Sequence, residues 1–472
     1  MRKTNRTTHR MRKLVSVLAI FTLLFGLTGC SKKDPREVLE EAYEKTFTKG
    51  NPTEALLGLA EINSKLKDNQ AQSAGFSFTL QELTNEDLRE SAGILSGLGI
   101  TVDTASDLLN RKSAATMDIT YGGTTYLTLG SQLQGSKIHI TSPQLLDGSL
   151  SVDLSTLDKD LASDSMLGQL FTMYGITLPD NFSADLLTAL LSPDSLANLG
   201  NLASAWEHLD DAVDIKEAEK ASVSLPSDVS VKKVYNVTIP KDAYVNFVGA
   251  LIKSGVDYYK SLPDSFGQSD AAALDTSELE ASLKQAADAV GDIVLTVAVA
   301  KDGYIRYAAG EIEDEENRIS LTAMFTGDKH PLTETEIKLA FTTDGKESEV
   351  TYEEAFDTKD NKITFSLEAT SDNKTILNFA GEGEFTDVEQ GKKYTLDFNY
   401  LELELADSLS VSLSGSTYVD TTKCDISAPS GTEYSLFTMS EQEFEELLAT
   451  VVTNLQEDPL FSNLLELIGT GY

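Results

Sequence analysis

Residues 333–374, TETEIKLAFTTDGKESEVTYEEAFDTKDNKITFSLEATSDNK, carry a clear strand pattern. Their apolar residues fall at every second position in two runs: Ile337, Leu339 and Phe341; Ile363, Phe365 and Leu367. Such alternation is typical of strands with one buried and one solvated face. Asp344-Gly345 and Asp372-Asn373 favour tight turns between these runs. The stretch therefore predicts antiparallel strands joined by hairpins.

The same pattern extends over residues 293–419, with strand signals at the spacing of a meander, about 8 to 12 residues. Asp302-Gly303 and Gln390-Gly391 mark further turns. No helix signal interrupts this run, so helices from elsewhere in the chain have to cover the apolar face of its sheet. Residues 240–290 and 440–467 have the required helical patterns. We expect both helical segments to lie on the meander.

The helix that begins after Pro240 has the widest apolar face in the chain, formed by Tyr244, Phe247, Val248, Leu251, Ile252 and Tyr259. Ser440 and Glu443 form a capping-box pattern at the start of the C-terminal helix. A helix is about 10 Å wide and strands lie about 4.8 Å apart, so each helix covers roughly two strands. The number of predicted strands is larger than the number that these helices can cover. We therefore expect an apolar pocket between sheet and helices, unless the sheet curls enough to close it.

Residues 34–239 show the same plan, with helical patterns followed by strand patterns. Predicted helices cover 34–47, 51–67 and 156–209, and 85–110 favour a helix and a loop. Predicted strands cover 74–80, 114–120, 124–130, 136–141, 148–154 and part of 213–239. Strands grouped in runs indicate an α+β fold rather than a doubly wound α/β fold. We expect either two similar halves, 34–239 and 240–472, or one long antiparallel sheet that curls over the helices like a half-barrel.

The N-terminus has the features of an export signal that ends in a lipidation site. Arg12-Lys13 precede an uncharged run, 14–27, that is shorter than the roughly 20 residues of a spanning helix. Leu27, Thr28 and Gly29, followed by Cys30, resemble the lipobox of bacterial lipoproteins. The resemblance implies that residues 1–29 are removed, that Cys30 is diacylated on sulfur, and that 30–33 form a short linker. An uncleaved membrane anchor is the alternative.

The charge of the chain excludes one class of partner. The chain has 38 basic and 75 acidic residues, and residues 1–29 hold six of the basic ones and no acidic one. Without that segment 32 basic residues face 75 acidic ones, a net charge of −43. A surface this acidic repels phosphate groups, so we expect no nucleic-acid binding.

Few residues offer catalytic or metal chemistry. His139, His208 and His330 are the histidines beyond Cys30, and no two of them have metal-ligand spacing. The chain has no nucleophile elbow, phosphate loop or dinucleotide fingerprint. We therefore expect a protein that is not an enzyme and that holds no cofactor and no metal.

The acidic residues near position 314 and the cysteine at position 424 each have a functional and a structural interpretation. Glu311 and Glu313–Glu316 lie in a predicted turn that either binds calcium or extends its carboxylates into solvent. The solvated turn is favoured, because the interleaved glycine and asparagine of calcium loops are missing. Cys424 has no partner if Cys30 is lipidated, so we expect a free, buried thiol.

The lipobox, the paired helices, the long antiparallel strands and the segment Val237-Thr238-Ile239-Pro240 before a helix resemble the LolA and LppX type of lipoprotein carriers. The resemblance implies a half-open barrel whose concave side holds lipid or another apolar molecule. We expect an extracytoplasmic lipoprotein, attached to the cell membrane by its N-terminal lipid, that binds an apolar ligand or an envelope partner. The alternatives are a substrate-binding lipoprotein of an import system, whose βαβ units the long strand run lacks, and a lipoprotein hydrolase.

Overall fold

The structure is a computed structural model. It describes residues 34–457, apart from 50, 69, 86–94, 162–167, 170–172, 175–199, 221–230, 262–276, 314–316, 344 and 407. The export signal and the lipobox therefore lie outside the described residues, as does most of the predicted helical region 156–209.

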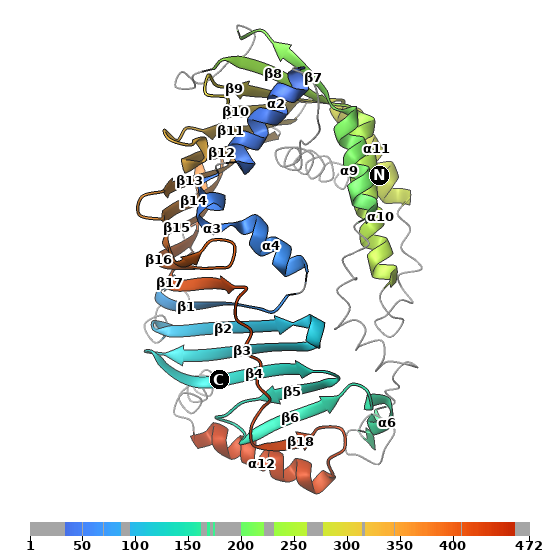
Figure 1. The fold of residues 1–472 in the computed structure, drawn as a ribbon, viewed down its shortest axis with the longest axis vertical. Coiled ribbons are helices and arrows are strands. Elements are labelled where there is room, and N and C mark those ends of the chain that lie inside the picture. The colour runs from blue at the N-terminus through green and yellow to red at the C-terminus, as the bar shows by residue number, and fades with distance from the viewer. Residues whose placement is uncertain are drawn as a thin grey trace.

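Within the described part of the chain, eighteen strands form one sheet that curls without closing (Figure 1). The predicted meander supplies β9 (Ile293–Val299), β10 (Ile305–Glu313), β11 (Asn317–Phe325), β12 (Glu334–Thr343), β13 (Lys346–Asp357), β14 (Lys362–Ser371), β15 (Lys374–Glu389), β16 (Lys393–Leu405) and β17 (Leu409–Asp420). The other strands are β1 (Gln72–Asn85), β2 (Leu98–Asp107), β3 (Lys112–Tyr121), β4 (Thr124–Gln134), β5 (Lys137–Thr141), β6 (Gly148–Asp153), β7 (Asp214–Ala218), β8 (Lys233–Ile239) and β18 (Thr432–Ser435).

Hydrogen bonding places the strands in the spatial order β7 to β17, then β1 to β6, and finally β18. All neighbouring strands are antiparallel except β18, which runs parallel to β6. The segments 34–239 and 240–472 share this one sheet, because β8 pairs with β9 and β1 pairs with β17. The division of the chain into two similar halves stays a prediction.

The register keeps apolar side chains on one side of the sheet. Leu339 on β12, for example, lies opposite Leu321 on β11 and Val350 on β13. We call the side that packs against helices the inner face and the other side the outer face. At the β14–β15 turn, Asp372 and Asn373 have φ angles of 50° and 61°, the left-handed backbone that a tight hairpin requires. The predicted alternation and this turn are confirmed.

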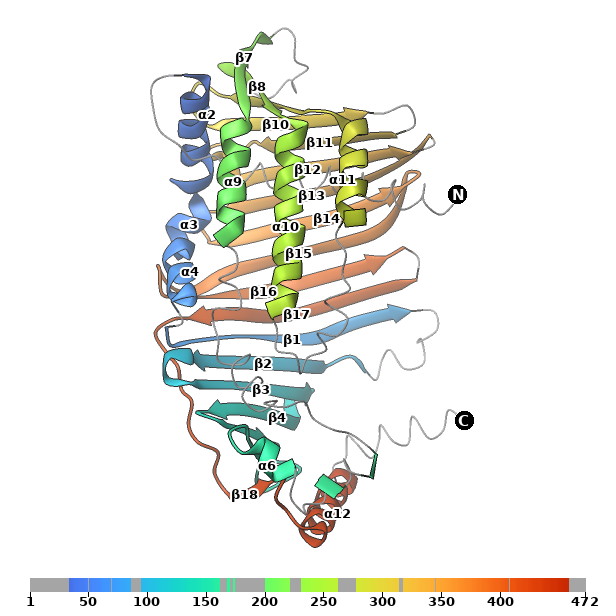
Figure 2. The same cartoon turned by 90° about the vertical axis from the view of Figure 1, so that its right-hand side faces the viewer.

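Helices α9 (Gly200–Ala212), α10 (Lys241–Ser261) and α11 (Ser277–Val290) lie side by side across the inner face (Figure 2). Tyr244 and Phe247 of α10 share a buried core with Ile293 and Leu295 of β9. The prediction that this helix packs on the sheet of the meander is confirmed.

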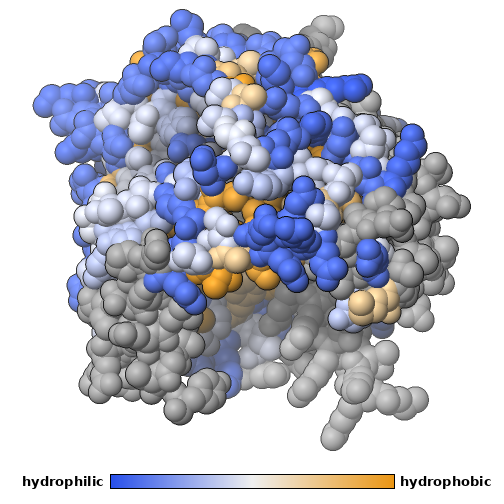
Figure 3. Space-filling model, turned by 90° about the horizontal axis from the view of Figure 1, so that it is seen from below, coloured by the Kyte–Doolittle hydropathy of each residue, from blue (hydrophilic) through white to orange (hydrophobic). Residues whose placement is uncertain are grey.

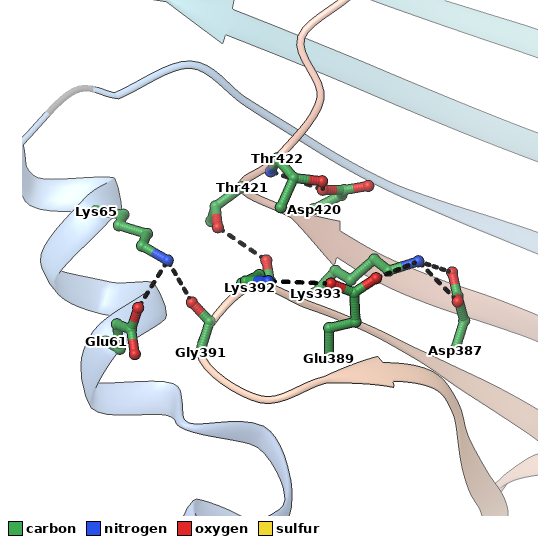
Figure 4. Close-up of polar contacts among 10 residues, drawn as sticks. All are labelled: Glu61, Lys65, Asp387, Glu389, Gly391, Lys392, Lys393, Asp420, Thr421 and Thr422. Carbon is green, nitrogen blue, oxygen red and sulfur yellow. Dashed lines mark hydrogen bonds and ion pairs between the residues drawn. The ribbon is translucent and has the colours of Figure 1, made fainter.

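Among the described residues, four short helical segments precede the sheet: α2 (Pro35–Tyr43), the π-helical turn η1 (Glu44–Thr48), α3 (Pro52–Leu57) and α4 (Leu59–Lys67). The predicted helix 51–67 is interrupted at Gly58, whose φ is 66°. A Cβ at Gly58 would lie 2.5 Å from the nitrogen of Gly391 in the β15–β16 turn. Lys65 forms an ion pair with Glu61 at 2.9 Å and donates to the Gly391 carbonyl at 2.6 Å (Figure 4). The break lets the helices attach to the middle of the sheet.

Two predictions about elements are wrong. Residues 98–107 form strand β2 instead of part of a helix and loop, because their backbone pairs with β1 on one side and β3 on the other. The C-terminal helix α12 (Glu441–Glu457) does not cover the meander. Its Leu447 packs with Leu146 and Met439 beside β6 and β18, at the opposite end of the sheet (Figure 1). Residues 421–431 connect β17 to this end, and the side chain of Gln132 on β4 donates to the carbonyl of Ser427 within them, at 2.8 Å.

Candidate functional site

Five phenylalanines form a continuous row across the inner face of β14, β15, β16 and β1. The ring centroids of Phe365 and Phe379 lie 5.5 Å apart, and those of Phe365 and Phe398 lie 6.5 Å apart. Phe398 and Phe78 are 6.0 Å apart, and Phe78 and Phe76 are 5.7 Å apart. The spacings are those of favourable aromatic contacts. This phenylalanine row runs roughly perpendicular to the strands.

Glycines within the strands make the row continuous. Gly415 on β17 lies between Phe398 and Phe78, opposite both in the sheet register. A Cβ at Gly415 would lie 2.6 Å from Cδ1 of Phe78. On β15 a Cβ at Gly381 would lie 2.7 Å from Cζ of Phe365. The missing side chains therefore leave space for rings from the neighbouring strands, and the face stays apolar.

Described helices cover the inner face only at some places. Helices α2 and α9 to α11 share a core with β7 to β12, and Leu57 of α3 packs on Phe356 and Phe385. Helix α12 covers the far end, at β6 and β18. Between these regions Phe76 is 38% exposed and Ile100 on β2 is 41% exposed. An apolar surface is thus accessible within the concave side of the sheet.

A polar pair borders the row. Tyr352 on β13 donates its hydroxyl hydrogen to the carboxylate of Glu354, which lies opposite Phe365 in the register. Burial raises the pKa of Tyr352, and the hydrogen bond to the charged Glu354 raises it further. The tyrosine therefore stays protonated at neutral pH. A few polar groups at the edge of an apolar surface are typical of sites that orient an amphiphilic ligand.

Two pockets lined by described residues lie elsewhere. One, of about 300 Å³, is lined mainly by outer-face and turn residues near Arg318 and Glu349. The other, of about 450 Å³, lies between β18 and α12. The apolar pocket between meander and helices stays a prediction.

The histidines do not meet at one site. His139 lies on β5, His208 on α9 and His330 in the turn before β12. Among the described residues no group of three or more histidine, cysteine, aspartate or glutamate side chains has an arrangement that could hold a metal ion. In the acidic turn, Glu311 forms an ion pair with Arg318 at 2.6 Å. One of the carboxylates that could have bound calcium is therefore paired with an arginine.

Cys424 is free, as predicted, but it is only half-buried rather than buried. It lies in the extended segment 421–431, which crosses the sheet without joining a core cluster among the described residues. Leu27, Thr28, Gly29 and Cys30 lie outside the described residues. The inner-face glycines were not singled out in the sequence, although glycine inside a strand often marks close approach of a neighbouring group.

Comparisons with known proteins identify no family. No family model matches the chain, and no curated protein matches it. A porin mutant of Rhodopseudomonas blastica is 10% identical with a TM-score of 0.21, over 74% of this chain and 99% of the porin. Transferrin Binding Protein B from Haemophilus parasuis is 8% identical with a TM-score of 0.10, over 74% of this chain and 76% of that protein. Scores this low carry no argument about this protein.

Within the described part of the chain, no helix combines the length and the apolar character needed to cross a membrane.

Proposed function

We propose that the protein is a non-enzymatic, extracytoplasmic lipoprotein, anchored through Cys30, that binds an acyl chain or a similar apolar ligand on the inner face of its sheet. The observation that carries this proposal is the phenylalanine row, in which Phe76 is exposed, together with the exposed Ile100 on the neighbouring strand. Apolar surface that stays accessible on a folded protein commonly marks a binding site.

The dimensions of the row suit one acyl chain. The row extends over four strand-to-strand steps, from β14 to β1, which is about 19 Å at about 4.8 Å per step. One leaflet of a bilayer is about 15 Å of hydrocarbon, half of the core thickness. A single chain of this length laid across the strands would therefore contact most of the row. Its polar end would lie near Tyr352 and Glu354.

The test is ligand binding by matched variants of one strand. Phe76→Glu places a charge on the row, whereas Thr79→Glu places the same charge on the outer face of β1. We expect the uncharged fluorophore N-phenylnaphthylamine to bind near one per chain, and Phe76→Glu to weaken it at least about tenfold, because a charge must then be desolvated. Thr79→Glu should bind like the unmodified protein.

Lipid extraction supplies the second readout. Protein purified from membranes should release a co-bound acyl lipid into organic solvent, beyond the lipid attached covalently to Cys30. Equal fluorophore binding by both variants, together with no extractable lipid, would exclude the inner face as a lipid site.

A further inference from the structure

Strand β18 and helix α12 enclose a groove that the inner-face proposal does not use. The groove has a volume of about 450 Å³. All four residues of β18, Thr432 to Ser435, line it. Consecutive strand residues point to opposite faces, so a groove that touches all of them runs along the edge of the strand. Among the described strands β18 pairs only with β6, so this edge carries no strand partner in the described part of the chain.

The opposite wall is one face of α12. Glu443, Glu446, Leu447 and Thr450 line the groove at helical spacing, and Leu146 and Met439 form its apolar floor. Leu448 and Val452, 53% and 42% exposed, lie on the opposite side of α12 and do not line the groove. Figure 3 views the molecule from this end and shows apolar residues exposed between hydrophilic ones. The groove thus combines an open strand edge with an apolar anchor point.

The negative charge around the groove indicates which kind of segment it binds. Helix α12 contains five glutamates and no lysine or arginine. Glu433 adds a carboxylate from β18, partly compensated by Lys137 at 2.9 Å. A segment with acidic residues would be repelled here, whereas a basic segment would be attracted.

We propose that this groove binds an extended, basic segment of a protein partner, which adds to the free edge of β18 as a further strand. Main-chain hydrogen bonds to β18 give the affinity, an apolar side chain of the partner contacts Leu447 and Met439, and its lysine or arginine side chains face Glu446. This is strand addition to an exposed sheet edge, with alternate side chains giving selectivity. The site is separate from the phenylalanine row.

The test uses the full-length protein and a fluorescein-labelled synthetic peptide in which lysine and valine alternate over nine residues. Fluorescence anisotropy should show saturable binding, weaker at high salt. Glu446→Lys should weaken binding about tenfold, as reversal of one charge near about 5 Å in water predicts. Glu441→Lys makes the same charge change on α12 outside the groove lining and should have a much smaller effect. Both variants should melt at the temperature of the unmodified protein.

Two further experiments test whether the peptide binds as an added strand. The same peptide with alternate backbone nitrogens methylated cannot form the strand ladder and should lose binding. Equal binding of the methylated peptide, or equal effects of Glu446→Lys and Glu441→Lys, would show general charge attraction and overturn the proposal. A dimer of the protein that Thr450→Trp converts to monomer would show that a second copy occupies the groove, which would also overturn it.

Discussion

At the scale of single residues, Gly58 fixes how the first helices meet the sheet. Its left-handed φ of 66° costs any other residue about 1–2 kcal/mol, and a Cβ would also clash with the backbone of Gly391. Gly58→Ala should therefore lower the free energy of unfolding by more than the backbone cost alone. Gly122→Ala is the matched control, because its φ is 57° and nothing lies within 4 Å of its Cβ position. Denaturant titration of both variants measures the difference, and equal losses would contradict a close contact at Gly58.

His330 gives the structure a dependence on pH. Its side chain is buried and its Nδ1 accepts the Leu332 amide hydrogen. Burial lowers the pKa of His330, and the Arg306 and Lys45 cations lower it further, which outweighs the opposing effect of the Lys45 backbone. The folded state thus favours neutral His330, so this contribution to stability is complete above the unfolded pKa of about 6.5 and is lost as pH falls through the folded pKa.

The expected result is a free energy of unfolding that declines between pH 7 and pH 5. His330→Asn keeps a side-chain acceptor for the Leu332 amide but does not titrate, so its decline over the same range should be smaller. Denaturant midpoints at several pH values measure this. A variant with the same pH dependence as the unmodified protein would assign the decline to other groups.

At the scale of elements, α10 holds the helical layer on the sheet. Phe247 is buried and its ring meets Trp206 of α9 at 5.5 Å in an edge-to-face contact. Phe247→Ala leaves a cavity in this core and should cost about 3–5 kcal/mol. The neighbouring Asn246 is exposed, so Asn246→Ala should change stability by less than about 0.5 kcal/mol. A Phe247→Ala protein that melts like Asn246→Ala would place α10 away from the sheet.

At the scale of the whole molecule, the cysteines separate membrane attachment from folding. Cys30→Ala should yield an uncleaved precursor without the diacyl mass, because the lipidated sulfur is the expected anchor. Cys424→Ala should stay lipidated and membrane-bound, since Cys424 is a half-buried free thiol far from the lipobox in sequence. Cell fractionation and intact mass measure both. An unmodified Cys30 in the native protein would end the lipoprotein interpretation.

The sequence determined the local structure of most of the sheet. Alternation with a period of two assigns each residue to a face, and short-range turn chemistry places the hairpins, so β9 to β17 were predictable from residues such as Leu339 and Asn373. The start of α12 was predictable as well, since Ser440 accepts the Glu443 amide hydrogen and Glu443 accepts the Ser440 amide hydrogen in the expected capping box. Such signals act over a few residues and need no tertiary contact.

The tertiary structure decided which elements meet. Nothing local specifies that β1 pairs with β17, yet this pairing alone brings Phe78 over Gly415 and joins the phenylalanine row. The sequence of α12 shows that one side of the helix is apolar, but it does not show which part of the sheet this side covers. The helix packs on β6 and β18 because the segment 421–431 leads the chain to that end of the sheet. Strand β2 is weakly patterned and is fixed by neighbours on both sides. Periodicity determines on which face of an element each residue lies. Which other element that face packs against depends on how segments distant in sequence come together in the fold.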